Sequence, residues 1–393
     1  MSAVVVTGTG ALSAVCADPA DLWQAMTERR EPVPEPAPGI GPECGPGLWR
    51  RIADPLLDRA REQLPSAGRS THAAWTAVSQ AVAQARLTDA DAVRMAVIVA
   101  GGVGDVEQAE RWRGGEAAPA HWPPTHRSAA VIADRLGARQ AALDLSNACA
   151  GGAYAMALGA GMIADGTADV VVAAGVETAS RLITASFNRL GALDPEGCRP
   201  FDRNRAGTSL AEGAGAVVLE STERARGRGV PVLGVVAGHG WTCDAHHATA
   251  PDPSGERITA AMRRAIERAD VRADDVGVVV PHATGTPLSD VTESTALGAV
   301  LGSRLGDVPV YSTKAALGHT GAASGLLSAV AALAVLRHGI VPPNIAVKES
   351  DPDCPVWVPS EEVAVRGSHA LVNAFAFGGH NICLVLAPAE DRP

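Results

Sequence analysis

Hydrophobic and polar positions follow two alternating patterns along this 393-residue chain. Short apolar runs rich in β-branched residues predict strands that are buried on both faces, and longer Ala-rich stretches between them predict helices. The predicted strands cover residues 3–7, 95–100, 141–146, 169–175, 213–220, 232–238, 276–282, 308–312, 369–375 and 381–387. The predicted helices cover residues 18–29, 70–85, 150–165, 255–269, 290–301 and 321–337. This alternation favours an α/β fold with largely parallel strands.

The pattern also repeats once. An apolar run at 143–146 leads through Cys149 into an Ala/Gly-rich helix, and a similar run at 310–313 leads through Lys314 and His319 into another. Each half then ends in a pair of apolar strands. We therefore expect a duplicated α/β unit, divided into residues 1–228 and 229–393, with functional residues where the halves meet.

Composition and charge narrow the class of protein. The net charge of −10 argues against nucleic-acid binding, which needs a basic face. The N-terminus lacks the pattern of a signal peptide, and the longest apolar run, 321–336, is better explained as a buried helix than as a membrane span. Seven scattered cysteines without a C-x-x-C pair disfavour a disulfide framework and fit a reducing cytoplasm.

Cys149 is the first candidate catalytic residue. It follows a predicted strand and precedes a predicted helix, so its thiol should lie near the positive end of that helix, where the thiolate is favoured. Small neighbours from Ala148 to Gly152 would leave room for a substrate. A free cysteine is nevertheless most often a small buried apolar residue, and this alternative stays open.

His282, Lys314 and His319 are the next candidates. His282 ends an apolar strand and precedes Thr284-Gly-Thr286, whose hydroxyls could line a polar slot. Lys314 and His319 lie in a Gly-bearing turn before a helix, and a lysine in apolar surroundings needs a reason because a buried ammonium is costly unless paired. The alternatives are a structural histidine, a lysine whose amine reaches solvent, and a helix-capping histidine.

Two further clusters have weaker signals. The two glycines of Phe377-Gly378-Gly379 could aim backbone N–H groups at an oxyanion, although an ordinary hairpin turn would contain the same residues. Cys243, His246 and His247 could be metal ligands, but no fourth ligand follows at a suitable spacing, so we expect no metal site.

Taken together, the motifs resemble one family. The chain resembles the β-ketoacyl synthases, the condensing enzymes of fatty acid and type II polyketide synthesis, from Val4 to Leu386. The segments that carry the resemblance are Asn147-Ala-Cys-Ala-Gly-Gly, Arg199-Pro-Phe-Asp-Arg-Asn-Arg, Glu212-Gly-Ala-Gly, His282-Ala-Thr-Gly-Thr-Pro-Leu, Ser312-Thr-Lys-Ala-Ala-Leu-Gly-His, Val341-Pro-Pro-Asn and Phe377-Gly-Gly-His-Asn.

The resemblance implies a thiolase fold, a duplicated five-layer αβαβα architecture that is usually dimeric. It implies that Cys149 carries the acyl group, that His282 and His319 stabilise the enolate of a malonyl thioester, and that Lys314 orients the histidines. The backbone of Cys149 and the turn at Phe377 and Gly378 would form the oxyanion hole and gate. No metal or organic cofactor would be needed.

The resemblance also implies residues that meet the partner. Thr249, Thr284 and Thr286 would bind the pantetheine arm of an acyl carrier protein, and Arg205 and Arg69 would contact the carrier itself. The chain would pair either with another copy or with a related ketosynthase-like subunit. Nucleic acid and membranes are not expected partners.

The chain departs from the family at several positions. Ser328 stands where many members have an acidic residue near Lys314, Thr208 replaces an aromatic residue, and Ala283 stands where glycine is common. The region between Met26 and Ser128 is shorter than usual. Two rival functions therefore remain: a non-elongating acyltransferase or decarboxylase, and a partner subunit that resembles a chain-length factor.

Overall fold

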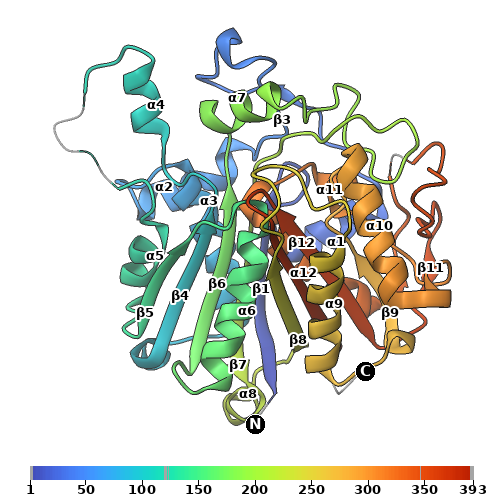
Figure 1. Cartoon of the computed structure of the whole chain (residues 1–393). Helices are drawn as coiled ribbons and strands as arrows, with labels where there is room; N and C mark the ends of the chain where they lie inside the picture. The colour runs from blue at the N-terminus through green and yellow to red at the C-terminus, as the bar shows by residue number, and fades with distance from the viewer. Residues whose placement is uncertain (1–2, 119–121, 123, 346, 390–393) are drawn as a thin grey trace.

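The computed structural model describes residues 3–118, 122, 124–345 and 347–389. Its main feature is a nine-stranded sheet in the order β5-β4-β6-β7-β1-β8-β13-β12-β9 (Figure 1). These strands are β1 (Val4–Ser13), β4 (Met95–Gly101), β5 (Ala141–Leu145), β6 (Val170–Glu177), β7 (Gly213–Ser221), β8 (Gly234–Cys243), β9 (Val276–Val280), β12 (His369–Ala376) and β13 (His380–Ala387). Two small ladders pair β2 (Glu35–Pro36) with β3 (Leu48–Trp49), and β10 (Ile340–Val341) with β11 (Val363–Ala364).

The sheet consists of two halves with the same strand plan. In the first half β4 is parallel to β5 and β6, and β7 is antiparallel to β6 and β1. In the second half β9 is parallel to β12, and β13 is antiparallel to β12 and β8. An antiparallel contact between β1 and β8 joins the halves.

The segment 308–312 occupies the place in the second half that β5 holds in the first. It was predicted as a strand, but it makes only isolated parallel bridges, from Val310 to Val279 and from Pro309 to Trp357. There are two physical reasons: Pro309 has no N–H for a ladder, and the side-chain amide of the distant Asn344 donates to the Val310 carbonyl at 2.8 Å. The strand prediction is wrong here, although the parallel placement beside β9 completes the duplication.

Helices lie between and outside the two halves of the sheet. The longer ones are α1 (Pro19–Thr27), α3 (Arg69–Gln84), α5 (Ser128–Leu136), α6 (Gly151–Ala164), α7 (Arg181–Arg189), α9 (Glu256–Ala269), α10 (Pro287–Leu301) and α12 (Ser324–His338). The shorter ones are α2 (Asp58–Gln63), α4 (Glu107–Arg113), α8 (Thr222–Arg228) and α11 (Thr313–Leu317). Of these, α2, α4, α5, α7, α8 and α11 were not predicted.

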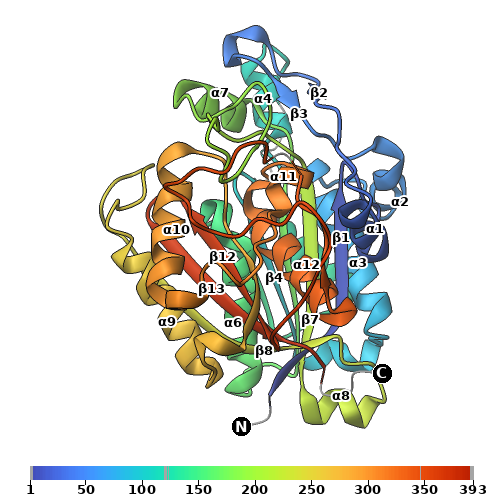
Figure 2. The same ribbon diagram turned by 90° about the vertical axis from the view of Figure 1, so that its right-hand side faces the viewer.

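The helices complete a five-layer arrangement. Helix α3 packs on β1, β6 and β7, helices α6 and α12 contact each other and both halves of the sheet, and α9 packs on β8 and β13. Figure 2 shows these layers in order, from α9 and α10 at the left to α3 at the right. The predicted duplicated thiolase-type α/β architecture is confirmed, whereas the boundary between residues 228 and 229 stays a prediction. The expectation of largely parallel strands is wrong, because five of the eight strand pairings in the nine-stranded sheet are antiparallel.

The Ala/Gly composition of the central helices follows from their close packing. A Cβ on Gly152 would lie 2.7 Å from the carbonyl oxygen of Ala322, and a Cβ on Gly325 would lie 2.7 Å from the backbone nitrogen of Ala153. The stretch Gly321–His338 is long and apolar enough to cross a membrane, but 78% of it is buried inside the fold. The prediction of a buried helix at this position is confirmed.

Candidate functional site

A cavity of about 360 Å³ lies where the two halves meet. Its lining includes residues from α7 and from the loops that follow β8, β9 and β12. Among the predicted site residues, the cavity is lined by Cys149, Thr249, His282, Thr284, Thr286, His319 and Phe377. The fold thus brings residues that are more than 200 positions apart in the sequence, such as Cys149 and Phe377, to the lining of one cavity.

Cys149 lies in a short 3₁₀ turn, Ala148–Ala150, between β5 and α6. The preceding residue, Ala148, has a φ of +44°, a conformation that L residues seldom adopt and that costs about 1 kcal/mol or more. This sharp turn leaves the thiol partly exposed in the cavity rather than sealed in the core. The sequence prediction of a strand-to-helix turn is correct.

The electrostatic setting of Cys149 differs from the expectation. Burial and, to a smaller extent, the Glu177 carboxylate raise the pKa of the thiol to about 12, and the Lys314 ammonium only partly opposes both effects. The proposed helix effect is therefore outweighed by desolvation and by a nearby anion. Without substrate, Cys149 is a thiol rather than a thiolate.

His282 follows β9 and is fixed through its backbone. The carboxylate of Glu293 accepts the N–H of His282 and the N–H of Ala283, each at 2.8 Å, and the side-chain amide of Asn373 at 2.9 Å. Ala283 has a φ of +40°, so the family's usual glycine would fit this backbone with less strain. The fully buried Glu293 thus holds the histidine turn in place.

Lys314 is only 2% exposed, so the alternative of an amine that reaches solvent is wrong. Its Nζ donates to the His282 carbonyl and lies 3.4 Å from His282 Nδ1. Because an ammonium can only donate, Nδ1 of His282 accepts, and the neutral ring then carries its proton on Nε2. Burial lowers the pKa of Lys314, and the Glu293 carboxylate is the strongest opposing influence.

Ser328 does not replace the missing acidic residue. Its hydroxyl lies 2.9 Å from the hydroxyl of Thr313, within a buried pair. Lys314 is therefore held by the carbonyl and ring of His282, while Glu293 supplies the compensating charge.

His319 meets His282 edge to face, with ring centroids 5.9 Å apart and planes at 85°. Its Nδ1 lies 3.1 Å from the hydroxyl of Ser324, at the start of α12, so Nε2 is the free ring nitrogen. Burial and the Lys314 ammonium hold the pKa of both imidazoles well below its ordinary value. Both rings are neutral at pH 7, and each can present one N–H donor.

The turn after β12 contains two left-handed glycines, with φ of +82° at Gly378 and +76° at Gly379. The N–H of Gly378 donates to the carbonyl of Ala248 at 2.8 Å, so it is not available to an oxyanion. This part of the predicted oxyanion hole is wrong. The ring of Phe377 lies 5.7 Å from the ring of Phe187 in α7, and both rings border the cavity.

The three threonines predicted to bind pantetheine share this cavity. The hydroxyls of Thr284 and Thr286 lie 3.0 Å apart. Between them the N–H of Gly285 donates to the buried carboxylate of Asp290, which fixes the loop. The loop therefore presents two hydroxyls to the cavity on a rigid backbone.

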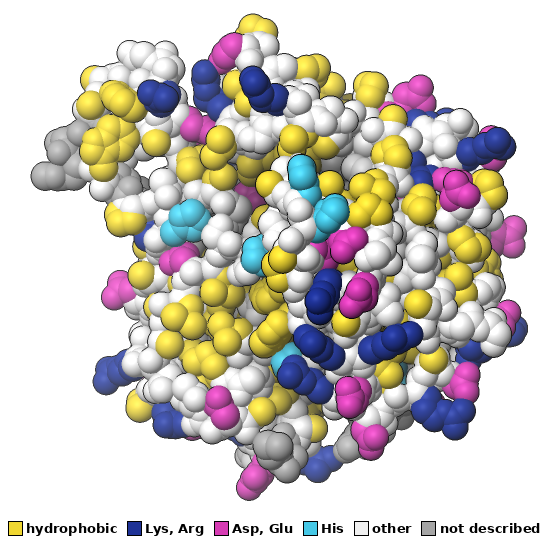
Figure 3. Space-filling model, in the orientation of Figure 1, with side chains coloured by type: hydrophobic (Ala, Val, Ile, Leu, Met, Phe, Trp, Pro, Cys, Tyr) yellow, Lys and Arg dark blue, Asp and Glu magenta, His cyan; other side chains and the backbone are white. Residues whose placement is uncertain are grey.

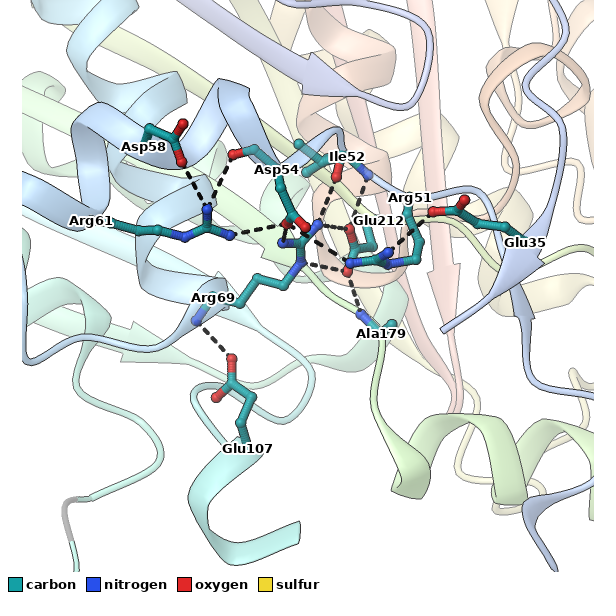
Figure 4. A network of polar contacts seen from close by, with 10 residues as sticks. All are labelled: Glu35, Arg51, Ile52, Asp54, Asp58, Arg61, Arg69, Glu107, Ala179 and Glu212. Atoms are coloured by element: carbon teal, nitrogen blue, oxygen red, sulfur yellow. Dashed lines mark hydrogen bonds and ion pairs between the residues drawn. The ribbon is translucent and has the colours of Figure 1, made fainter. Parts of the chain in front are cut away.

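Arg205 and Arg69 are not placed as surface cations, which corrects the prediction that they contact a carrier protein. The side chain of Arg205 is 4% exposed and pairs with Asp351 and Asp290. The side chain of Arg69 is 16% exposed and forks onto the buried carboxylate of Glu212, with bonds of 2.9 and 2.7 Å (Figure 4). Both arginines hold loops around the site together.

The alternative of a metal site finds no support in the side-chain geometry. His247 Nδ1 accepts the backbone N–H groups of Thr249 and Ala250, and the Cys243 thiol lies 3.5 Å from the Gly378 carbonyl. Within the described ranges, no group of three or more His, Cys, Asp or Glu side chains could hold a metal ion.

Sequence reasoning missed Glu293, Glu177, Phe187 and Ser324. A charged residue at the end of an otherwise apolar strand, as in Val170–Glu177, is a usable signal for Glu177. Glu293 lies in a mixed stretch of α10 and had no distinctive pattern, whereas Phe187 lies in α7, whose strong helical apolar period was a usable signal that was overlooked.

Comparisons with known protein families and with individual relatives point to the same family over most of the chain. Residues 47–225 match the family model described as "Beta-ketoacyl synthase, N-terminal domain", and residues 233–348 match the corresponding C-terminal domain. A protein named 3-oxoacyl-[acyl-carrier-protein] synthase 2 from Synechocystis sp. is 32% identical over 97% of both chains. Nodulation protein E of Rhizobium meliloti is 32% identical over 97% of this chain and 98% of the relative.

Solved structures give the same result. The ishigamide ketosynthase/chain length factor matches with a TM-score of 0.89 and 30% identity over 99% of both chains. A β-ketoacyl synthase from Burkholderia phymatum also has a TM-score of 0.89, with 27% identity over 99% of this chain and 100% of the other. Together with the site geometry, these matches show that the chain belongs to the β-ketoacyl synthase family.

Proposed function

We propose that this protein is a β-ketoacyl-[acyl-carrier-protein] synthase that condenses a malonyl thioester with an acyl group held on Cys149. The observation that carries this proposal is the single cavity lined by Cys149 and by two neutral imidazoles, with the buried Lys314 behind them. A nucleophile and two N–H donors in one enclosed space suit carbon–carbon bond formation through an enolate.

The first step is acyl transfer. The sulfur of Cys149 attacks the carbonyl of an acyl thioester, the bond from that carbonyl to the carrier sulfur breaks, and the carrier leaves as a free thiol with the proton that Cys149 loses. The backbone N–H groups of Cys149 and Phe377 are the proposed donors to the tetrahedral oxyanion. Since burial raises the pKa of Cys149 to about 12, deprotonation must accompany attack rather than precede it.

The second step is decarboxylative condensation. The Nε2–H groups of His282 and His319 would donate to the thioester carbonyl of malonyl carrier and stabilise the enolate as carbon dioxide leaves. The enolate carbon then attacks the acyl carbonyl, the bond to Cys149 sulfur breaks, and the departing sulfur takes a proton from water to restore the thiol. Neutral imidazoles suit this role because each keeps an N–H donor for the oxygen on which charge develops.

The remaining residues would support substrate access. The hydroxyls of Thr249, Thr284 and Thr286 are the proposed partners of the pantetheine arm, and Phe377 is the proposed gate. The steps above need neither a metal ion nor an organic cofactor, because nothing is oxidised or reduced by an outside agent and the one proton that the cycle consumes comes from water.

The proposed partners are an acyl carrier protein and a second subunit, either another copy or a related ketosynthase-like chain. The second choice is supported by the name of the ishigamide ketosynthase/chain length factor, which is 30% identical. We propose a role in polyketide or other specialised metabolism and a cytoplasmic location, with which seven free cysteines are consistent.

The test is to incubate purified protein with acyl carrier and malonyl carrier and to measure the mass of the carrier-bound product. A 3-oxoacyl product two carbons longer than the acyl donor is expected. Release of carbon dioxide without a longer product would instead identify a decarboxylase. Acyl exchange alone would identify an acyltransferase, and inertness with every carrier would favour a partner subunit without catalysis.

A further inference from the structure

Three arginines form one line along the exposed face of α9. Arg257, Arg264 and Arg268 are spaced by seven and four residues, which places them above one another on a helix. The acidic residues Glu256 and Glu267 each lie one residue away, roughly 100° around the helix, and follow a different line. The basic line is therefore continuous.

No ion pair among the described residues neutralises these arginines, although Glu267 lies three residues from Arg264 and Asp252 lies within electrostatic reach of Arg257. In the part of the chain that the structure describes, no carboxylate lies within 4.0 Å of their guanidinium groups. Arg264 donates to the Trp241 carbonyl at 3.0 Å, and Arg268 donates to the His239 carbonyl at 3.1 Å. Buried arginines elsewhere, such as Arg205, are matched with carboxylates.

An aromatic row on β8 borders the arginines. The rings of His239 and Trp241 stack with centroids 5.1 Å apart, and Tyr154 lies 5.9 Å beyond Trp241. Trp241 is 40% exposed although it is large and apolar. We call Arg257, Arg264, Arg268, Trp241 and His239 together the α9 strip.

The α9 strip leads to the mouth of the catalytic cavity. Its upper end is tied to β8, because the Thr242 hydroxyl donates to the Arg257 carbonyl at 2.7 Å. The loop that connects β8 to α9 supplies Asp244, Thr249, Ala250 and Pro251 to the cavity lining. Figure 3 shows basic side chains gathered over α9 in the middle of this face, next to a group of histidines.

We infer that the α9 strip is the docking surface for an acidic face of the acyl carrier protein. This inference rests on the proposed function, since that function requires a carrier at the cavity mouth. A local basic line on a chain of net charge −10 would attract and orient an acidic partner, and the exposed indole would supply an apolar anchor. The strip thus takes over the role that Arg205 and Arg69, both paired with carboxylates, cannot fill.

The test compares two variants of the same helix. Arg264→Glu/Arg268→Glu reverses the charge of the α9 strip, whereas Arg263→Glu changes an exposed arginine on the other line of α9. The rate of Cys149 acylation is measured by intact mass, with acyl carrier protein and with the acyl thioester of free pantetheine as donors, at low and high salt. The milder Arg264→Gln/Arg268→Gln guards against misfolding.

With the carrier as donor, the double charge reversal should slow acylation about ten-fold or more at low salt, and the difference should shrink at high salt. The Arg263→Glu control should change the acylation rate with the carrier by less than about two-fold. With the free pantetheine thioester as donor, all variants should be acylated at the rate of the unmodified protein. If the strip variants behave like the control with the carrier, the inference is wrong. It is equally wrong if they lose binding to anionic vesicles or DNA while carrier kinetics stay unchanged.

The two proposals fail in different ways. If the unmodified protein is acylated by neither donor, the proposed function fails. If it is acylated by both donors and the strip variants keep full carrier activity, only the docking surface fails.

Discussion

The two halves of the fold use the same strand-to-helix turn for opposite purposes. In the first half, β5 leads through a short 3₁₀ turn directly into α6, and the turn presents Cys149 to the cavity. In the second half, the segment 308–312 leads through α11 to His319 before α12 begins. The extra turn of helix buries Lys314 and delivers an imidazole instead of a thiol.

The buried charges differ in the same way. The first half places the Glu177 carboxylate near its nucleophile, and the second half places the Lys314 ammonium near its histidines. An anion beside Cys149 raises its pKa, and a cation beside the imidazoles lowers theirs. Both effects favour neutral groups, so the site holds a neutral thiol and two neutral N–H donors until substrate arrives.

The largest effect should come from removing the imidazoles. His282→Ala/His319→Ala deletes both proposed enolate donors and should lower condensation by about 10³-fold or more, since one such donor is worth about 10²–10³. Acylation of Cys149, for which the proposed oxyanion donors are the backbone N–H groups of Cys149 and Phe377, should continue. Product mass and intact-protein mass measure the two steps, and equal loss of both would contradict this division of labour.

A smaller loss is expected for Lys314→Met. Removal of the ammonium raises the pKa of His282, because Lys314 lowers it in the native site. The acid limb of the condensation rate against pH should therefore move to higher pH, with a loss of up to about ten-fold on the acid side, because burial still holds the pKa of His282 below its ordinary value. An unchanged pH profile with only a lower melting temperature would show that Lys314 serves packing alone.

Glu177→Gln should change the reactivity of the Cys149 thiol by a moderate amount. The amide keeps an acceptor for the Ala322 N–H, which lies 3.2 Å from the carboxylate, but removes the negative charge that raises the pKa of Cys149. Burial raises the pKa of Glu177 to about 7, so the native carboxylate is charged mainly above that pH.

The measurement is the rate at which iodoacetamide alkylates Cys149. The Glu177→Gln variant should react faster than the unmodified protein, with a difference that grows as pH rises through 7. The surface variant Glu256→Gln is the control and should follow the unmodified protein. Slower alkylation of Glu177→Gln at high pH would show that the sign of this electrostatic effect is wrong.

The smallest effect, on the free energy of unfolding, should come from relieving the backbone strain at Ala283. Ala283→Gly should stabilise the protein by about 0.5 kcal/mol, because relief of a positive φ outweighs the entropy that glycine loses on folding. The helical control Ala260→Gly in α9 should destabilise by roughly 1 kcal/mol. Denaturant unfolding compares them, and equal losses in both would argue against backbone strain next to His282.

The fold could be predicted from local pattern because its central strands are continuous apolar runs, such as β4 and β6, and its central helices are Ala/Gly-rich. The segment 308–312 was not correctly predicted, because an Asn344 side chain replaces a strand partner, a contact that no local pattern encodes. Helices such as α7 were missed because their sequences lack a continuous apolar run.

The candidate catalytic residues could be named from their motifs, but their environment could not. The sequence motif identifies the turn at position 149, whereas the raised pKa of the Cys149 thiol depends first on burial by the tertiary fold and then on Glu177, a residue of another strand. Arg205 and Arg69 have the right charge for a carrier contact, yet both form ion pairs with carboxylates that lie far away in the sequence. Charge is visible in a sequence, whereas its compensation depends on tertiary contacts.

The central claim is that the first half supplies a nucleophile that becomes covalently acylated. The most direct measurement is the intact mass of the protein after incubation with acyl carrier, for the unmodified chain and for Cys149→Ala. The account predicts one added acyl group on the unmodified chain and none on Cys149→Ala, with Cys198→Ala behaving like the unmodified chain. An acyl group that persists in Cys149→Ala, or never forms on the unmodified chain, would contradict the account.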